Sequence, residues 1–536
     1  MAMNGAQALV KMLENHDVTH VFGIPGAKID SVFIALMDSS IELVLCRHEQ
    51  NAAFMAAAMG RMTGKVGVCL VTSGPGVTNL VTGLATATSE GDPVLAIGGE
   101  VPLYDRLKHT HQALDGVDVM KPVVKYAAEA LTVPMLPEVF SSAVRAAESG
   151  RQGAAFIGLP KDVGLAEFPG EVNPAWGRFV AEGRPAAEEI ERAAAVINKA
   201  RRPVALLGMQ SSQTRSIEAL KRFIAAFGAP YASTFQGAGG WAEPAGSKQY
   251  AGRVGLFRNQ PADKLLETAD CVITIGFDAI EYDPVVWNQD TKRPIVAIDA
   301  TPVAQDQAFL PAAELIGDLS ASLDALAPLL APKVDEGFRR LSYDAAAEVA
   351  GTISEGARLG GSPVHPLRVI HELRQVVTPE TTLALDVGSH YIWMNRYFPA
   401  SHARQVLVSN GQQTLGVALP WAMAANIARP GSPVISVSGD GGFLFSAMEL
   451  ETAVRRQPVC ASYLEQRLLR HGLLPGGSAL WPDGRRGARP LRCRRLRREL
   501  RLPGLSHQRC ERTRPPAAGS AGLARPGSHR YSHRLR

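Results

Sequence analysis

Long apolar runs, paired cysteines and a leader-like N-terminus are all missing from this sequence of 536 residues. No run of about 18 apolar residues occurs, so no membrane-spanning helix is predicted. The six cysteines form no CxxC pair, and neither a disulfide framework nor a zinc site is indicated. The opening MAMNGAQALVKMLENHD lacks a basic stretch followed by an apolar one. We therefore expect no signal peptide and a cytoplasmic location.

Lysine is absent from residues 458–536, which hold 18 Arg and only 4 acidic residues. The preceding 457 residues hold 38 basic and 47 acidic side chains, so this part of the chain is net acidic although the whole chain has a net charge of +5. Gly, Pro and Arg follow no period in the tail, which is predicted to be disordered. A basic tail is one signal of nucleic-acid binding. The near absence of aromatic residues for stacking disfavours nucleic acid as a partner.

Short apolar runs alternate with helical patterns up to about residue 457. Runs such as KVGVCLVTSG and DPVLAIGG are rich in β-branched residues and end in glycine, which is typical of buried parallel strands. Two Pro- and Gly-rich stretches, at 165–187 and 351–365, interrupt this rhythm. The predicted fold class is therefore α/β, with three units built on doubly wound parallel sheets and the third unit incomplete.

The strongest chemical signal is VSGDGG at 437–442, where an apolar strand runs into a glycine-rich turn. Glycines let backbone N–H groups approach an anion closely, and the helix that follows adds its positive N-terminal dipole. Asp440 between the glycines can hold Mg²⁺, which binds phosphate oxygens together with one or two protein carboxylates. The plain alternative is a hairpin turn, because Asp-Gly is a common turn pair.

Three further segments join a strand to a helix through small residues. In RHEQNAAF, Glu49 begins an Ala-rich helix, and its simplest role is a favourable interaction with the helix dipole. TSGPGVTNL at 72–80 and SNGQQTLG at 409–416 suit either a structural turn or a close approach of backbone to a ligand. Neither loop matches GxGxxG or the P-loop pattern, so nicotinamide binding and simple ATP hydrolysis are not supported.

Taken together and in this order, the segments resemble thiamine-diphosphate-dependent enzymes, and among them the acetolactate synthases of the catabolic type. The likeness is carried by VFGIPGAKID, RHEQNAAFMAAAMGRMTGK, LVTSGPGVTNLVTGLATATSEGDPV, AGRVGLFRNQ and SNGQQTLGVALPWA. The resemblance implies a pyrimidine-binding domain at 1–165, a middle domain at 186–345 and a truncated diphosphate-binding domain at 362–457. An Arg-rich aberrant tail follows at 458–536.

The resemblance also implies a reaction, in which two pyruvate molecules condense to 2-acetolactate with release of CO₂. Thiamine diphosphate and Mg²⁺ are the implied cofactors. A carboxylate at N1′ of the aminopyrimidine, here Glu49, favours the imine whose nitrogen removes the thiazolium C2 proton. The thiazolium then serves as the electron sink for decarboxylation. Active sites in the family lie between subunits, so a homodimer or homotetramer is expected, with no membrane partner.

Further positions carry over by motif from the family. Glu49, Gln112 and Lys28 are assigned to catalysis, although Lys28 fits a solvated helix lysine equally well. Asp440 is assigned to the metal, and Leu415 stands where the family places an apolar residue under the bent cofactor. The positions assigned to the cofactor are Pro25, Gly26, Gly76, Asn79, Ser389, His390, Gly411, Leu415, Gly439, Gly441 and Gly442.

The middle region departs from the flavin-binding branch of the family. Biosynthetic synthases that bind FAD show Gly-Met-His-Gly and Arg-Phe-Asp-Asp-Arg blocks. Here GRVGLF at 252–257 and GFDAIEYDP at 276–284 stand in those places. We therefore expect no FAD.

The family's second metal ligand is missing from this sequence. No Asp or Asn occurs between Gly441 and Pro482, and the expected window reads Glu465, Gln466, Arg467. Read one nucleotide later, permitted codons for YLEQR spell Thr-Trp-Asn-Asn-Gly after an apolar strand. This is the missing motif, and it suggests a frameshift near codons 456–461. Off-frame reading of a GC-rich gene would also account for a tail rich in Arg, Pro, Gly and Ala.

Three interpretations remain open at this point. In the first, the gene encodes an acetolactate synthase and the frameshifted chain has little or no activity. In the second, the chain is a non-catalytic descendant whose basic tail binds nucleic acid or another anion. In the third, it is another thiamine-diphosphate decarboxylase or carboligase with a different substrate.

Overall fold

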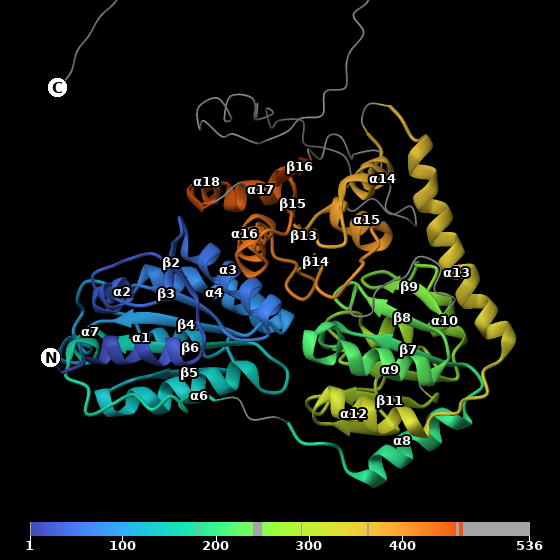
Figure 1. Ribbon diagram of the computed structural model, residues 1–536, viewed down its shortest axis with the longest axis horizontal. Helices are drawn as coiled ribbons and strands as arrows, with labels where there is room; N and C mark the ends of the chain where they lie inside the picture. Colours follow the sequence, from blue (N-terminus) through green and yellow to red (C-terminus); the bar gives the residue numbers. More distant parts are fainter. Residues whose placement is uncertain are drawn as a thin grey trace, which may run out of the picture.

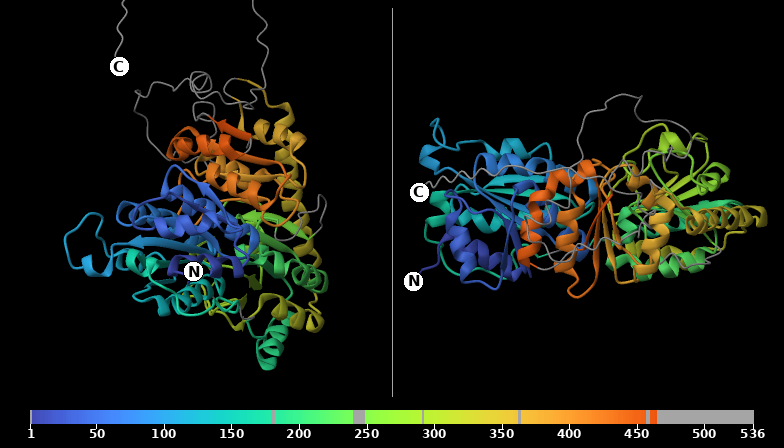
Figure 2. Two further views of the ribbon diagram at one scale, coloured as in Figure 1. Left: turned by 60° about the vertical axis from the view of Figure 1, so that its left-hand side comes forward. Right: turned by 90° about the horizontal axis from the view of Figure 1, so that it is seen from above.

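Three parallel sheets, each flanked by helices, follow one another along the chain (Figure 1). The third unit lies against both of the others when the molecule is seen from above (Figure 2). The α/β class with three parallel sheets is therefore confirmed. The computed structural model describes residues 2–178, 182–239, 249–290, 292–361 and 364–456, and the backbone of 460–464.

The first unit contains a six-stranded sheet in the order β2-β1-β3-β4-β6-β5. Because the winding reverses between β1 and β3, a crevice forms at the carboxyl ends of these two strands. The strands are β1 His20–Gly23, β2 Glu42–Leu45, β3 Gly67–Val71, β4 Val94–Glu100, β5 Tyr126–Glu129 and β6 Ala154–Pro160. The helices are α1 Gly5–Asn15, α2 Asp30–Met37, α3 Glu49–Thr63, α4 Pro75–Glu90, α5 Gly116–Met120, α6 Leu136–Glu148 and α7 Lys161–Leu165.

The second unit contains a six-stranded sheet in the order β12-β11-β10-β7-β8-β9, with its own reversal between β7 and β10. Its strands are β7 Pro203–Leu207, β8 Tyr231–Thr234, β9 Tyr250–Val254, β10 Cys271–Ile275, β11 Ile295–Asp299 and β12 Ala313–Ile316. Its helices are α8 Ala187–Lys199, α9 Ile217–Phe227, α10 Asp263–Thr268, α11 Pro284–Trp287 and α12 Leu319–Leu326. The long helix α13 Glu336–Glu355 then runs along the side of the molecule to the third unit (Figure 1).

The third unit contains four described strands in the order β14-β13-β15-β16, and its winding reverses between β13 and β15. The strands are β13 Thr382–Leu385, β14 Val406–Leu407, β15 Val434–Gly439 and β16 Cys460–Leu464. The helices are α14 Pro366–Val376, α15 Ser389–Tyr397, α16 Ala418–Ala428, α17 Asp440–Ser446 and α18 Leu450–Arg456.

Strand β16 corrects the predicted end of the third unit at residue 457. Its backbone pairs in parallel with β15, from Cys460 opposite Ile435 to Leu464 opposite Gly439. A strand in this place satisfies backbone groups of β15 that would otherwise form an unpaired edge. The rest of the predicted tail, 465–536, lies outside the described residues, and the other domain boundaries remain predictions.

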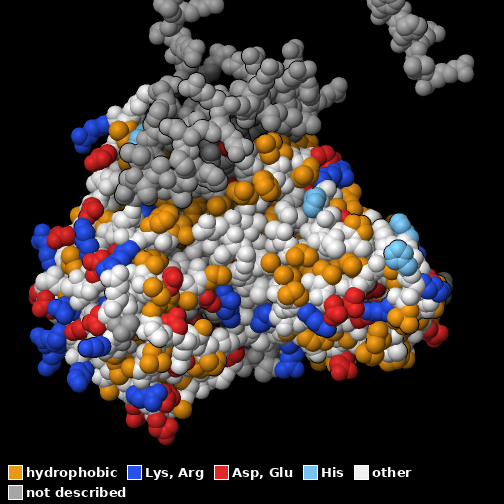
Figure 3. Space-filling view, turned by 180° about the vertical axis from the view of Figure 1, so that it is seen from behind, with side chains coloured by type: hydrophobic (Ala, Val, Ile, Leu, Met, Phe, Trp, Pro, Cys, Tyr) orange, Lys and Arg blue, Asp and Glu red, His pale blue; other side chains and the backbone are white. Residues whose placement is uncertain are grey.

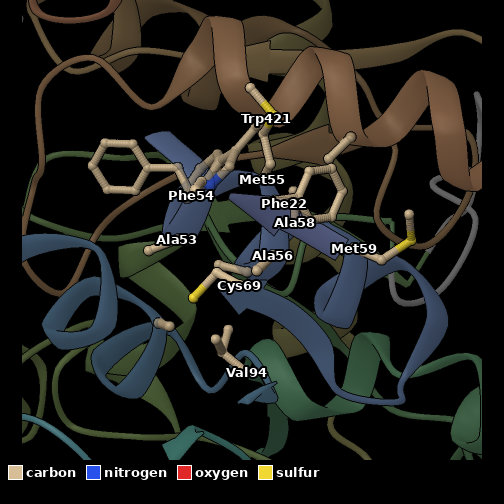
Figure 4. Packing of buried hydrophobic residues seen from close by; sticks show 14 of the residues in the cluster. Phe22, Ala53, Phe54, Met55, Ala56, Ala58, Met59, Cys69, Val94 and Trp421 are labelled. Carbon is tan, nitrogen blue, oxygen red and sulfur yellow. The ribbon is translucent and has the colours of Figure 1, made fainter. Parts of the chain in front are cut away.

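Helix α3 joins the first and third units in one hydrophobic core. Its alanines are fully buried, and their small side chains allow neighbouring helices to approach closely. A Cβ on Gly83 of α4 would lie only 2.4 Å from the Ala53 Cβ atom. On the other side, Trp421 of α16 lies against Phe54 and Met55 of α3 (Figure 4). The start of α3 is therefore positioned by packing against both the first and the third unit.

The surface carries both signs of charge. On the face shown in Figure 3, Lys and Arg side chains are intermixed with Asp and Glu, and hydrophobic side chains lie among them. Within the described residues, no helix is both long and apolar enough to cross a membrane. The described cysteines Cys46, Cys69 and Cys271 are buried and unpaired.

Candidate cofactor and active site

Two glycine loops meet in the crevice of the first unit. Pro25 and Gly26 follow β1, and Gly76 lies in the first turn of α4, just after the loop that follows β3. A Cβ on Gly26 would lie 2.5 Å from the Thr72 Cβ atom, and a Cβ on Gly76 would lie 3.0 Å from Thr72 Cγ2. A side chain at position 26 would overlap Thr72, and one at position 76 would press against it. Three of the predicted cofactor residues are thus gathered at the edge of the sheet where ligands bind in such folds.

Glu49 lies at the same edge, as the first residue of α3 after β2. Its Oε2 accepts a hydrogen bond from Asn79 Nδ2 at 2.9 Å, so these two predicted residues are in contact. The backbone immediately before Glu49 is hydrogen-bonded to Glu449 of the third unit. There, Glu449 Oε1 accepts hydrogen bonds from the Arg47 and His48 N–H groups at 2.8 and 3.1 Å. Glu449 is a positioning residue that the sequence did not reveal.

Gln112 and Lys28 border the same crevice. Gln112 has a φ of 62°, an uncommon conformation for a residue with a side chain. It packs on Gly74 of the glycine loop, where an added Cβ would lie 3.1 Å from the Gln112 Cβ atom. Lys28 is half-buried, and among the described residues its ammonium group has no hydrogen-bond or ion-pair partner. Its catalytic role stays a prediction.

A second crevice lies in the third unit, where the winding reverses. Ser389 and His390 begin α15, and the predicted glycines lead from β15 into α17. A Cβ on Gly439 would lie 3.3 Å from His390 Cε1, and a Cβ on Gly442 would lie 2.5 Å from Asp386 Oδ2. Two helix N-termini therefore face one narrow crevice, an arrangement that favours an anion.

Buried polar atoms in this crevice lack well-formed hydrogen bonds. Asp386 Oδ1 accepts hydrogen bonds from the Gly416 and Val387 N–H groups at 2.8 and 2.9 Å. The Ser438 hydroxyl lies near the carboxylate, yet Oδ2 makes no well-formed hydrogen bond among the described residues. The His390 ring lies near the Asp386 carbonyl, yet neither of its nitrogens makes a well-formed hydrogen bond. Burial raises the pKa of Asp386 to about 6 and lowers that of His390 to about 4. Such groups are rare in folded proteins, and a polar ligand fits here.

Asp440 is partly exposed and suits a metal bound mainly through a ligand. Within the described residues its Oδ1 accepts only the N–H of Gly441, at 3.0 Å. No described group of three or more His, Cys, Asp or Glu residues could hold a metal. Mg²⁺ needs few protein carboxylates when phosphate oxygens and water complete its shell.

Leu464 ends β16 opposite Gly439, so β15 and β16 end at the same edge of the sheet. The predicted ligand window at 465–468 follows directly and lies outside the described residues.

The loop that carries Leu415 is anchored at both ends. Glu90 Oε1 accepts hydrogen bonds from the Ser409 hydroxyl at 3.2 Å and from the next two backbone N–H groups, ending at Gly411, at 3.0 and 2.9 Å. Asp386 holds the other end through the hydrogen bond from Gly416 described above. Leu415 between the anchors is 36% exposed and free to contact a ligand. Glu90 and Asp386 are further positioning residues that motif comparison missed.

Apart from Gly411 and Leu415, which lie on the loop between Glu90 and Asp386, the predicted residues form two groups, one in each crevice. Among the described residues, no hydrogen bond or ion pair joins Glu49, Gln112 or Lys28 to the crevice of the third unit. The single chain thus presents two half-sites, each built from loops at the carboxyl ends of parallel strands.

Substitution of Gly442 tests how tightly the second crevice is packed. We expect Gly442→Ala to lower the free energy of unfolding by about 1–3 kcal/mol, because the new Cβ overlaps the Asp386 carboxylate. Gly441→Ala is the matched control, since nothing described lies within 4 Å of its Cβ position. It should raise stability by up to about 1 kcal/mol through helix propensity. Urea unfolding of the cofactor-free protein measures both, and equal effects would contradict this geometry.

The corresponding crevice of the second unit is filled by the chain itself. Glu281 Oε2 accepts hydrogen bonds from the Met209 N–H at 2.8 Å and the Thr234 hydroxyl at 2.5 Å. Its Oε1 accepts the Asp278 N–H at 3.0 Å. Burial raises the pKa of Glu281 to about 8. A fixed carboxyl group thus takes the backbone donors that could otherwise hold a phosphate group.

Glu281 makes stability depend on pH in a defined direction. Its ordinary pKa is 4.5, so between pH 5 and 8 the folded protein keeps a proton that the unfolded chain has lost. The stabilisation that this bound proton gives to the folded protein is fully present below pH 4.5, and it is lost as pH rises through 8. We expect Glu281→Gln to remove up to about 1.4 kcal/mol per pH unit from the slope of the unfolding free energy in this window. Glu191→Gln, on the exposed surface of α8 in the same unit, should leave the slope unchanged.

Comparison with known proteins identifies the class of the fold and its crevices. The chain matches the N-terminal TPP binding domain of thiamine pyrophosphate enzymes at residues 3–119. It matches their central domain at 190–326 and their C-terminal TPP binding domain at 386–463. The three units are therefore those of a thiamine pyrophosphate enzyme.

Full-length relatives narrow the assignment. The chain is 47% identical over 458 residues to the acetolactate synthase of Bacillus subtilis, covering 84% of this chain and 79% of the relative. It is 46% identical over 460 residues to the catabolic acetolactate synthase of Raoultella terrigena, covering 84% and 81%. The large subunit of Escherichia coli isozyme 2 is 32% identical over 463 residues, covering 85% and 81%. The chain belongs to the acetolactate synthase family, which confirms the resemblance and the enzyme class predicted from sequence.

Proposed function

We propose that the site of this chain is built for the Mg²⁺- and thiamine diphosphate-dependent condensation of two pyruvate molecules to 2-acetolactate and CO₂. The observation that carries the proposal is the crevice of the third unit. There, glycines and two helix N-termini surround buried atoms of Asp386 and His390 that make no well-formed hydrogen bond, next to Asp440. This donor set fits a diphosphate with its metal. The reaction itself is inferred from membership of the acetolactate synthase family.

The chain's own residues divide the work between the half-sites. His390 stays neutral at physiological pH, because burial lowers its pKa, and one ring N–H can donate to a phosphate oxygen. Asp440 would bind Mg²⁺. Glu49 would hold a proton at the pyrimidine N1′ position, with Asn79 fixing its carboxylate. When bound, the cofactor supplies the electron sink for decarboxylation. Leu415 and Gln112 would shape the space around it.

A second copy of the chain would complete the site. The half-sites do not meet through described contacts within one chain, so we propose that Glu49 of one subunit serves the diphosphate crevice of another in a homodimer or homotetramer. We also propose that the enzyme works without FAD. The Glu281 carboxyl group supports this, since it occupies the backbone donors in the crevice of the second unit.

The function is tested by product analysis with several 2-oxo acids. The protein assayed carries the shifted reading after codon 457, in which permitted codons spell the Asn-Asn motif. With thiamine diphosphate, Mg²⁺ and pyruvate, we expect one acetolactate for each CO₂ released. Release of acetaldehyde without acetolactate would identify a simple decarboxylase instead. Preference for another 2-oxo acid over pyruvate would identify a different carboligase.

A further inference from the structure

A cleft of about 600 Å³ opens between the first and second units. The ends of α1, α3 and α6 line it on one side, and residues 213–215 of the second unit line it on the other. Trp176, in the connection between these units, and Arg404 of the third unit complete the wall. A cavity of this size is typical of small-molecule sites. The cleft lies apart from both half-sites, and the proposed reaction makes no use of it.

Arg404 is the unusual residue of this cleft. It is only 8% exposed, and it also lines an adjoining inner pocket of about 30 Å³. Its Nε is buried without a hydrogen-bond partner. Among the described residues, no ion pair reaches the guanidinium either. A buried charge without hydrogen bonds is costly, so proteins normally pair it or use it to bind a ligand.

Neighbouring acids are already engaged by other cations. Asp92 is the carboxylate that acts most strongly on Arg404, but both of its oxygens accept hydrogen bonds from Arg61, at 2.7 and 2.8 Å. At the outer wall, Lys65 pairs with Asp17 at 2.6 Å. Burial lowers the pKa of Arg404 to about 10, which leaves it charged at neutral pH but poorly solvated. Arg61 also lies 3.7 Å from Glu90, which lines the same inner pocket, so the two arginines face two carboxylates there. Arg404 itself still forms no ion pair among the described residues, and its Nε has no hydrogen-bond partner.

The backbone of Arg404 is held in an uncommon conformation. Its φ is 56°, in the left-handed region that residues with side chains rarely adopt. The preceding Ala403 carbonyl accepts a hydrogen bond from Arg429 at 3.4 Å, which helps to fix this turn. Strain of this kind persists where the surroundings enforce it, and it is concentrated at ligand sites.

We propose that this cleft binds a small carboxylate or phosphate compound, with the Arg404 guanidinium as its principal cationic ligand. A guanidinium offers a planar pair of N–H donors that matches either oxyanion in a two-point contact. The indole of Trp176 is 39% exposed and provides an apolar wall for the rest of the molecule. The ligand class is thus a small organic acid or a phosphate compound that enters between the first two units.

Thermal unfolding of the full chain tests the proposal. Sodium phosphate and sodium pyruvate are titrated separately, at constant ionic strength and with thiamine diphosphate and Mg²⁺ in excess. We expect at least one anion to raise the unfolding temperature saturably, by about 2–4 °C. In Arg404→Asn the rise should disappear, and asparagine tolerates the left-handed backbone at this position. A response to phosphate alone or to pyruvate alone identifies the source of the oxyanion.

Two further variants separate binding from folding. Arg404→Lys keeps the charge but loses the paired donors, so the concentration for half the shift should rise about tenfold. Lys65→Gln removes a cation that already has a partner and should leave the titration unchanged. If neither anion produces a saturable shift, or if the Arg404 variants respond as the unmodified chain does, the proposal is wrong. Binding that survives these substitutions belongs to another site.

Discussion

In the protein with the shifted reading after codon 457, replacing Glu49 with glutamine is expected to lower the rate of acetolactate formation by about 10²- to 10⁴-fold, the range typical for loss of a positioned acid or base. Glutamine keeps the size of the side chain and can still accept the 2.9 Å hydrogen bond from Asn79. It cannot supply the negative charge that stabilises a protonated pyrimidine N1′. The loss should therefore appear in kcat, and cofactor affinity should change only a few-fold. Exchange of the C2 proton of bound thiamine diphosphate, followed by NMR in deuterium oxide, should slow in parallel.

The matched control is Glu451→Gln, on the neighbouring surface of α18. Glu451 forms ion pairs with Arg47 and Arg455, which lower its pKa to about 2, so it carries a negative charge at neutral pH. It is largely exposed and should contribute little to activity. Both substitutions remove one negative charge close to the start of α3. If Glu49→Gln keeps more than a tenth of the activity, the role proposed for Glu49 is wrong.

Local sequence patterns predicted the parts of the site that depend on neighbours along the chain. The turn around Asp440 reads directly as a strand, a glycine-rich loop and a helix, and the structure places it at the carboxyl end of β15. The glycines facing Thr72 could be predicted for the same reason, because a close approach of the backbone requires glycine, which is visible in the sequence. The α/β class could be predicted for a similar reason, since buried parallel strands read as short apolar runs.

Residues whose partners are distant in the sequence could not be predicted from local patterns. Glu449 is 402 positions from the Arg47 N–H group that it binds, and Glu90 is 319 positions from Ser409. A lone glutamate looks like a solvated side chain until folding brings its partners to it. Asp386 could have been found, because DVGSH follows an apolar strand as Asp440 follows another. Both then lie at the carboxyl ends of adjacent strands, where ligands bind.

Reading the gene one nucleotide later after codon 457 is expected to raise acetolactate formation at least 100-fold over the present chain. Strands β15 and β16 end in register, Gly439 opposite Leu464, so a ligand that directly follows β16 starts from the same edge as Asp440. With the permitted codons GAA and CAA, the shifted reading puts Asn in place of Glu465 and Gln466. The match to the C-terminal TPP binding domain ends at residue 463, just before this point. Side by side, the two proteins are assayed for kcat and for the Mg²⁺ concentration at half-maximal rate.

Two controls separate the ligand from the rest of the restored segment. In the restored protein, alanine at the first of the two new asparagines should raise the required Mg²⁺ concentration and lower kcat, because one oxygen ligand is lost. In the present chain, Glu465→Asn alone should leave activity low, since the segments that the family places after the motif are still missing. Resequencing across codons 450–475 gives an independent measurement. An unbroken frame together with robust turnover by the present chain would contradict the frameshift and show that Asp440 binds Mg²⁺ without the asparagine.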